Sequence, residues 1–145
     1  IQIHIETWDR TALEEQEATF GRKRGSGAPL TGKKEFDELD LKAKDSTGEY
    51  VIPEDAHARL AREAKTSIKR RAYNYTAGTN EKTGNLETGL LFISFQKSPQ
   101  QFIDIQNHLG HKDKLNEYIT HRGTATFIVL PGVQKGGYLG ETLFN

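Results

Sequence analysis

The sequence predicts an α+β domain in the order strand, helix, strand, strand, helix, strand, with a long insertion after the first helix. Three observations support this fold class. Residues 1–5 alternate apolar and polar side chains, as in a half-buried strand. Residues 11–20 and 102–109 place apolar side chains at helical spacing. Residues 90–95 and 124–130 are strongly apolar runs of strand length, and the second is followed by a Pro-Gly pair.

The first helix is expected from about Thr11 to Phe20. Thr11 and Glu14 can form a capping box, and Leu13 shares a helical face with Phe20. The insertion that follows, residues 21–50, has no apolar period. A stretch of this length without regular structure is unusual inside a compact domain and is often functional. A surface excursion explains the same pattern.

A second helix is expected after the insertion. Pro53 suits its first turn, and Ala56, Leu60 and Ala64 form its buried stripe. With a strand at 68–75, the order becomes βαββαβ with an insertion, which is the ferredoxin-like arrangement. The strands at 90–95 and 124–130 are apolar on both faces. Helices are therefore expected on one face, and a cofactor or a second half absent from this chain on the other.

Composition limits the possible functions. The 145 residues suit one domain, and the 20 acidic and 20 basic residues balance, which argues against nucleic acid or a membrane surface as a partner attracted by bulk charge. The chain has no cysteine, so disulfides and thiol chemistry are excluded. No apolar run is long enough to span a membrane. The chain has no methionine and begins in a strand pattern, so we expect a fragment or a cleaved chain.

His57 is the strongest candidate for a metal ligand among the five histidines. It lies in the short second helix, where its neighbours on the same face, Ala61 and Ala64, are small and leave space for a large flat molecule. A buried histidine with satisfied hydrogen bonds explains the same pattern. Structural roles at polar faces or helix ends are expected for the other four, His4, His108, His111 and His121.

Two arginines also stand out. Arg70 alternates with Ile68 and Ala72, so it lies on an otherwise apolar strand face and must be paired or face a site. A buried salt bridge would satisfy it equally well. Arg22 begins a basic run just after the first helix, where it can hold a carboxylate or a phosphate. A solvated charge run is the alternative.

Several segments carry a family resemblance when they are taken in order. They are Glu6-Thr7-Trp8-Asp9-Arg10, Glu15-Gln16-Glu17 with Phe20-Gly21-Arg22, Ala56-His57-Ala58-Arg59, Arg70-Arg71-Ala72-Tyr73-Asn74-Tyr75, the apolar run at 89–96, and Pro131-Gly132 with Gly136-Gly137-Tyr138-Leu139-Gly140. Together they resemble the dye-decolorising (DyP-type) haem peroxidases, in particular the A-type, deferrochelatase-like group. The resemblance covers essentially the whole chain.

The resemblance implies a fold of two ferredoxin-like halves, with residues 1–145 as the carboxy-terminal, haem-binding half. The family's Gly-x-x-Asp-Gly motif, which supplies a distal aspartate, does not occur in this sequence. The resemblance therefore implies a partner, the amino-terminal half of the same enzyme, which carries that aspartate. It also implies secretion or a place in the cell envelope, and it leaves a homo-oligomer open.

The resemblance implies haem b as the cofactor. His57 is then the ligand of the haem iron, and Asp113 holds the other ring nitrogen of that histidine. A helix N-cap is the alternative role of Asp113. Arg70 is expected over the distal haem face as the catalytic residue, with Leu90 and Phe92 as the apolar wall beside it.

The haem propionates need cationic partners. We expect Arg22 to pair with one propionate, with help from Arg59, two residues beyond the iron ligand. Arg24 is a less favoured substitute for Arg22.

The implied function is a haem-dependent peroxidase that uses hydrogen peroxide to oxidise dyes and other one-electron donors through an oxyferryl intermediate. Surface aromatic residues are possible electron relays: Trp8, Tyr73, Tyr75, Tyr118 and Tyr138. Two alternatives stay open. One is a haem-binding module for iron release or haem transport, and the other is a ferredoxin-like interaction domain without a cofactor.

Overall fold

The fold is a four-stranded antiparallel sheet with helices on one side. A computed structural model describes residues 1–143 of the chain. The strands are β1 (Gln2–Ile3), β2 (Lys69–Thr79), β3 (Leu86–Phe95) and β4 (Ile119–Thr120). Their order in the sheet is β2-β3-β1-β4, and all neighbours are antiparallel. This order confirms the predicted ferredoxin-like fold.

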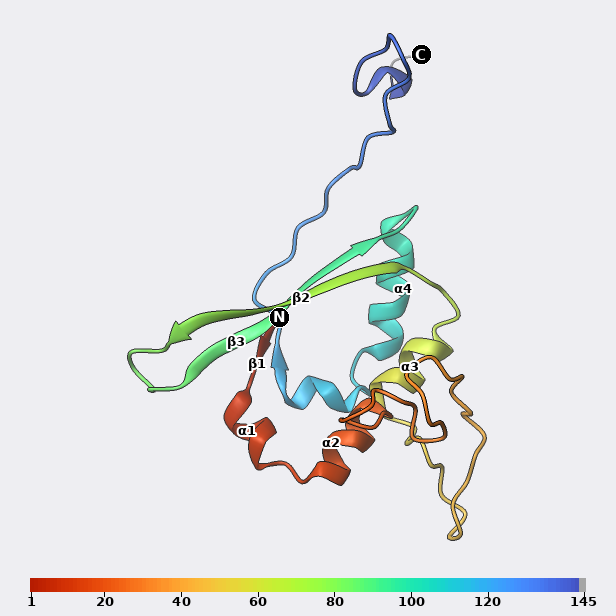
Figure 1. Cartoon of the computed structure of the whole chain (residues 1–145), viewed down its shortest axis with the longest axis vertical. Coiled ribbons are helices and arrows are strands. Elements are labelled where there is room, and N and C mark those ends of the chain that lie inside the picture. The colour runs from red at the N-terminus through yellow and green to blue at the C-terminus, as the bar shows by residue number, and fades with distance from the viewer. Residues whose placement is uncertain (144–145) are drawn as a thin grey trace.

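Most of the helices lie near the predicted places, but two short ones, at residues 5–10 and 141–143, were not predicted. The helices are α1 (Ile5–Arg10), α2 (Leu13–Phe20), α3 (His57–Glu63), α4 (Pro99–Leu109) and two 3₁₀ helices, η1 (Lys114–Glu117) and η2 (Glu141–Leu143). Figure 1 shows α2, α3 and α4 on one side of the β2–β3 hairpin, and the chain after β4 leaving on the other. α4 begins with a complete capping box between Ser98 and Gln101, which fixes where it starts.

The hairpin of β2 and β3 has a defined register, which sets two faces. Arg70 pairs with Ser94, Ala72 with Phe92, and Asn74 with Leu90. Phe92 packs on Phe102 of α4, with ring centroids 6.2 Å apart, so this face looks toward the helices. The opposite face carries exposed apolar and aromatic side chains: Tyr73, Tyr75, Leu91, Ile93 and Phe95.

Gly89 is the one buried residue within the four strands. A Cβ added there would clash with the carbonyl oxygen of Ile1 and would lie 2.6 Å from the hydroxyl of Tyr75. That hydroxyl donates a hydrogen bond of 3.2 Å to the same Ile1 carbonyl. Only glycine leaves room for this close approach of β1, β3 and a tyrosine of β2.

The start of the chain differs from the prediction. The expected strand at 1–5 is shortened to β1, because Ile5 begins the additional helix α1. The expected capping box of Thr11 and Glu14 was wrong. Thr11 lies between the two helices and its hydroxyl donates to the carbonyl of Thr7, 2.9 Å away, so it closes α1 and does not cap α2.

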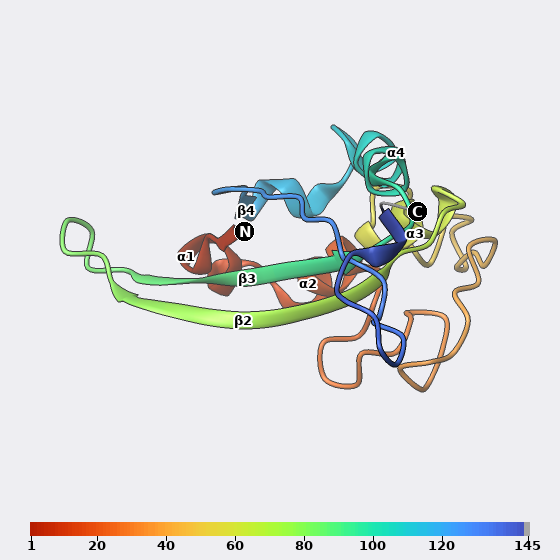
Figure 2. The same ribbon diagram turned by 90° about the horizontal axis from the view of Figure 1, so that it is seen from above.

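The last strand also differs. We predicted it at 124–130, whereas β4 is Ile119–Thr120 and residues 121–130 run on as an extended segment outside the sheet. The physical reason lies in β1, which offers only two residues for pairing. Apolar content alone does not make a strand when no neighbouring edge is available for its backbone. In Figure 2 this segment runs past β3 without joining the sheet, and in Figure 1 it extends away from the hairpin.

The insertion extends over residues 21–56 and has no helix or strand of its own. This was predicted for residues 21–50, whereas the helix expected from Pro53 was wrong at its start, because the backbone is still extended at Ala56 and α3 begins at His57. The insertion is not a loose excursion. Ala28, Pro29 and Ile52 are fully buried in it. Arg22 bridges Pro29, and Lys44 bridges Tyr50, as isolated β-bridges. The insertion therefore forms a core together with α2 and α3.

None of the helices among residues 1–143 is both long and apolar enough to cross a membrane.

Candidate functional site

His57 and Asp113 form a hydrogen-bonded pair. His57 is the first residue of α3, and its Nδ1 lies 2.7 Å from Oδ2 of Asp113. The Asp113 side chain is 4% exposed and that of His57 is 29% exposed. Because an ionised carboxylate only accepts hydrogen bonds, Nδ1 carries the proton and donates it. The lone pair of the imidazole is then on Nε2, which has no hydrogen-bond partner among the described residues.

Asp113 has two roles at once. Its Oδ1 accepts the backbone N–H of Leu115 at 3.0 Å and so caps η1, while Oδ2 faces His57. Asp113 therefore makes both the predicted contact with His57 and the alternative contact of a helix N-cap. The N–H of Lys114 donates to the carbonyl of Asp55 at 3.1 Å, which ties η1 to the turn before α3. This backbone contact fixes the two members of the pair relative to each other.

The start of α3 is positioned by close packing. Gly21 ends α2 in the left-handed region, with φ +72°, and an added Cβ would lie 2.9 Å from Ile52 and 3.3 Å from Ala56. Ala56, directly before His57, is fully buried. The ring of Phe20 lies edge-on to the imidazole, with centroids 6.3 Å apart. α2 thus contacts the candidate ligand directly, a contact that spacing within one helix could not predict.

Arg59 is buried and engaged within the protein. Its Nη1 donates to the carbonyl of Ile52 at 2.9 Å, and its Nε donates to Glu63 at 3.1 Å. The guanidinium carbon also lies 4.4 Å from the ring centroid of Tyr50. These contacts tie the insertion to α3. Its predicted help at a propionate stays a prediction.

Lys114 and Glu15 link η1 to α2. They form an ion pair, and the hydrogen bond to the Glu15 carboxylate raises the pKa of the Lys114 ammonium above its ordinary value of 10.5. Each side chain is partly exposed, so the pair adds little stability by itself. The ion pair instead positions η1, because it holds η1 beside α2, whose Phe20 packs against His57.

Arg70 lies on the helix-facing side of the sheet together with Leu90 and Phe92, because these residues share the face that the β2–β3 register defines. The shared face is as predicted. Arg70 is exposed, and no salt bridge to it is found among residues 1–143, so a buried ion pair does not account for its place on this face.

Arg22 is held by the insertion. Its Nη1 donates to the carbonyls of Gly27 at 2.7 Å and Glu35 at 2.9 Å. Arg24 turns back and donates to Gln16 of α2 at 2.9 Å. Arg22 is therefore ordered beside α2, with one terminal nitrogen committed to backbone carbonyls. Its pairing with a propionate stays a prediction.

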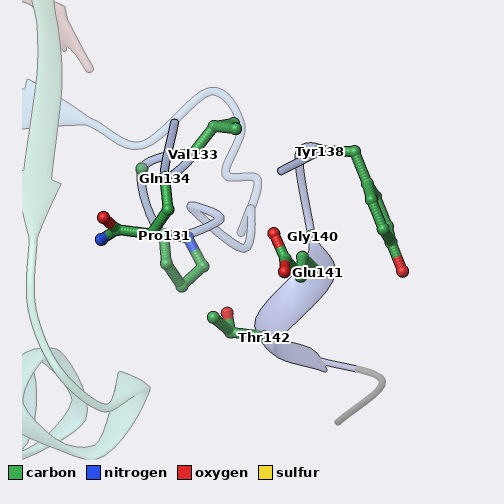
Figure 3. A pocket seen from close by; sticks show the side chains of 8 residues that line it. Pro131, Val133, Gln134, Tyr138, Gly140, Glu141 and Thr142 are labelled. Atoms are coloured by element: carbon green, nitrogen blue, oxygen red, sulfur yellow. The ribbon is translucent and has the colours of Figure 1, made fainter. Parts of the chain in front are cut away.

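The candidate relay residues have different surroundings. Trp8 packs edge-to-face on Tyr118 at 4.9 Å, and Tyr118 is buried. Tyr73 and Tyr138 are exposed. Figure 3 shows a hollow in the carboxy-terminal stretch, formed by Pro131, Val133, Gln134, Tyr138, Gly140, Glu141 and Thr142. It contains none of the predicted haem-site residues.

Comparisons with known proteins give one consistent family. A deferrochelatase of Yersinia pestis is 42% identical over 152 residues, which cover 100% of this chain and 34% of the relative. A dye-decolorizing peroxidase of Thermobifida fusca is 38% identical over 150 residues, with the same coverage of 100% and 34%. The chain thus spans about a third of the length of these curated relatives.

Solved structures agree with the sequence relatives. The crystal structure of a DyP-type peroxidase from Streptomyces coelicolor matches with a TM-score of 0.90 and 34% identity, over 98% of this chain and 40% of that one. Ferric DtpA from Streptomyces lividans matches with a TM-score of 0.81 and 31% identity, over 98% of this chain and 40% of that one. The family described as Dyp-type peroxidase, C-terminal, matches residues 1–134, and the chain therefore belongs to the Dyp-type peroxidase family.

Proposed function

We propose that this chain is the haem-holding part of a peroxidase that uses hydrogen peroxide to oxidise dyes and other one-electron donors. The observation that carries the proposal is the pair of His57 and Asp113. Its 2.7 Å hydrogen bond leaves Nε2 as the coordinating nitrogen at the start of a helix. A neutral imidazole held in this way by a carboxylate is the usual proximal ligand of a peroxidase iron.

The residues present fit haem b. Among residues 1–143 there is no group of three or more His, Asp and Glu side chains placed to hold a metal ion. An iron bound at His57 would therefore take most of its ligands from a bound molecule, as it does in a macrocycle. Ala61, one turn after His57 on the same face of α3, is small and half-buried, which suits a flat ring system. Arg22, ordered by its bonds to the carbonyls of Gly27 and Glu35, is the predicted partner of a propionate, with Arg59 as the predicted helper.

The proposed division of labour follows from the chemistry of each side chain. Haem, when bound, supplies the redox chemistry by which peroxide is reduced. His57 binds the iron, and Asp113 keeps the proton on Nδ1 and makes Nε2 a better donor. Arg70, always charged, stabilises the negative charge on the departing peroxide oxygen, and Leu90 and Phe92 exclude water beside it.

A second part of the enzyme completes the proposal. Something near the iron must move the peroxide proton, and no carboxylate of this chain matches the family's Gly-x-x-Asp-Gly motif. The curated relatives extend well beyond the matched third of their length. We assign the distal aspartate to an amino-terminal half of the same enzyme. A place outside the cytoplasm and a homo-oligomer also stay proposals by family resemblance.

The test is a pair of histidine variants. His57→Ala should lose bound haem or the spectrum of a histidine-ligated iron when the chain is titrated with haem and followed at the Soret band. His111→Ala is the matched control, because His111 is exposed and near the same helices. An unchanged His57→Ala spectrum would overturn the assignment.

The second candidate function is iron release from haem. It is favoured by the name deferrochelatase, which the relative with 42% identity carries. Both functions use the same His57, so haem binding does not separate them. Steady peroxide-dependent dye oxidation by the assembled enzyme supports the peroxidase, whereas accumulation of metal-free protoporphyrin IX, detected by its fluorescence, supports iron release.

A further inference from the structure

Three aromatic side chains lie in a row that ends at the candidate iron ligand. The row runs from Tyr118 to Trp8, from Trp8 to Phe20, and from Phe20 to the imidazole of His57. The centroids of neighbouring rings are 4.9, 5.5 and 6.3 Å apart, and neighbouring ring planes cross at 78°, 89° and 76°. Aromatic pairs favour edge-to-face contacts of this kind. The position of each ring in this aromatic row therefore limits the tilt of the next.

The aromatic row closes into a circle of contacts around His57. Asp113 is the N-cap of η1, and Tyr118 is the C-cap of the same helix. The Asp113 carboxylate accepts the Nδ1–H of His57 at 2.7 Å. The imidazole is thus held from both ends of η1. The contact with Asp113 is direct, and the contact with Tyr118 passes through the rings of Trp8 and Phe20.

Trp8 is held in the aromatic row by buried main-chain contacts. At the end of α1, the side-chain amide of Gln16, a residue only 3% exposed, donates to the carbonyls of Trp8 at 2.7 Å and Thr11 at 3.2 Å. At the start of α1, the N–H of His4 donates to the carbonyl of Tyr118 at 2.8 Å. α1 has six residues and buries none of them, so its own packing stabilises it little. The contacts at its two ends therefore give Trp8 a defined place.

The hydrogen bond to Asp113 does not by itself fix the plane of the imidazole. A hydrogen bond constrains the line between donor and acceptor much more than rotation about that line. The ring of His57 could therefore turn while its Nδ1–H still pointed at Asp113. Phe20 contacts the same ring from a different element, α2. Two contacts from separate elements leave the ring far less freedom to turn than either contact alone.

We propose that Phe20 and Trp8 are positioning residues, which set the plane of the His57 imidazole and thereby the direction of the Nε2 lone pair. The inference rests on the proposed function, in which Nε2 binds the haem iron. A ligand nitrogen has to point along its bond to the metal, and side chains behind a metal-binding histidine fix the orientation of its ring. Asp113 determines which nitrogen carries the proton, and the aromatic row determines where the other nitrogen points.

The first test uses the haem-free chain. Exchange of the His57 Nδ1–H with water is measured by nuclear magnetic resonance in the unmodified chain and in Phe20→Leu, which keeps an apolar side chain but removes the flat ring. The energy of one aromatic contact corresponds to roughly a 2- to 10-fold change in an equilibrium. The Nδ1–H should exchange about 2- to 10-fold faster in Phe20→Leu, because the freed imidazole leaves Asp113 more often. Trp8→Leu should have a smaller effect in the same direction, since it acts through Phe20.

Two variants serve as matched controls. Phe20→Tyr keeps the ring at a position that is 36% exposed, and it should keep the slow exchange of the unmodified chain. Leu13→Ala removes apolar bulk from the same helix at a residue that is 56% exposed and lies outside the aromatic row, and it should leave the exchange unchanged. Equal acceleration in Leu13→Ala and Phe20→Leu would show that α2 has only loosened, and would overturn the proposal.

The second test determines the plane of the imidazole when haem is bound. In ferric haem with cyanide on the side opposite to the histidine, the proton shifts of the haem methyl groups depend on the orientation of the imidazole plane. Phe20→Leu and Trp8→Leu should change the pattern of these shifts, whereas Phe20→Tyr and Leu13→Ala should retain it. Unchanged Nδ1–H exchange in Phe20→Leu, or an unchanged methyl pattern in both leucine variants, would overturn the proposal. A chain that binds no haem would contradict the proposed function, while the haem-free test would still decide whether Phe20 and Trp8 position His57.

Discussion

Replacing Asp113 by asparagine removes the negative charge beside His57 while keeping a side chain that can cap η1. Asparagine caps helices about as well as aspartate, so the hydrogen bond from the N–H of Leu115 survives. Asparagine has only one oxygen, so when that oxygen caps η1 the amide NH2 faces His57 and donates to Nδ1, which moves the ring proton to Nε2. The change therefore removes the charge and also reverses the tautomer of His57. Asp113→Ala is the companion variant, because it removes the charge, the hydrogen bond to His57 and the cap together.

The magnitude follows from the 2.7 Å contact in a buried place. A hydrogen bond to a charged group is worth about 1.5–3 kcal/mol, and one between neutral groups about 0.5–1.5 kcal/mol. The difference of roughly 1–1.5 kcal/mol is about a tenfold change in an equilibrium constant. Loss of the charge alone therefore weakens haem affinity about tenfold. Because Asp113→Asn also places the ring proton on Nε2, we expect Asp113→Asn and Asp113→Ala each to weaken haem affinity by about 10- to 100-fold, the range for loss of such a partner.

Two measurements check this prediction. Haem titration followed at the Soret band gives the affinities. Nitrogen chemical shifts of the His57 ring in the haem-free chain report the tautomer, with the proton on Nδ1 in the unmodified protein, on Nε2 in Asp113→Asn and a mixture in Asp113→Ala. Equal affinities for all three proteins, with an unchanged tautomer, would show that Asp113 only caps η1 and would refute the reasoning.

Three further predictions concern other parts of the site. Arg70→Leu should retain haem but slow peroxide consumption by about 10²-fold, the scale for one electrostatic donor, and an unchanged stopped-flow rate contradicts that role. Gly21→Ala should lower the free energy of unfolding in urea by about 1–3 kcal/mol, because of its positive φ and its contact with Ile52, whereas Gly25→Ala, which meets nothing within 4 Å, should change it by less than about 0.5 kcal/mol. Because the pKa of Lys114 is raised in the folded chain, its ion pair with Glu15 stabilises the fold fully below the ordinary lysine pKa of 10.5, and this stabilisation is lost as the pH rises through the folded-state pKa. Lys114→Met should therefore flatten the alkaline fall in melting temperature. An identical fall in both proteins contradicts this prediction.

Local sequence patterns predicted most of the elements but not the ends of the chain. The apolar runs located β3, and helical spacing located α2 and α4, because these patterns lie within the elements themselves. The pattern did not identify the buried side of α2, where Gln16 and Thr19 are buried and Leu13 and Phe20 are exposed. The strand at 124–130 failed because pairing depends on a neighbouring edge, which no local pattern contains. α1 was missed because it is only six residues long and buries no residue, so it leaves no apolar stripe.

The site was predicted unevenly for a similar reason. His57 stood out by its small neighbours on one helix. Its partner Asp113, 56 positions away in the sequence, came only from the resemblance, since nothing local distinguishes it from an ordinary cap. Arg59 was expected at a propionate because of its nearness in sequence to His57. Its buried contacts with Ile52 and Glu63 show that the same position can serve to hold the insertion on α3.

The His57–Asp113 pair and Arg70 depend on different parts of the fold. His57 lies beside the packed core, where Ala28, Ile52 and Ala56 are fully buried and hold the start of α3 independently of the sheet. Arg70 lies on β2, whose residues are all exposed, in a sheet with one buried position, Gly89. Local stability follows local burial. The His57–Asp113 geometry should therefore persist in this chain alone, whereas the orientation of Arg70 depends on whatever completes the sheet. Binding of haem and turnover of peroxide are then separable properties.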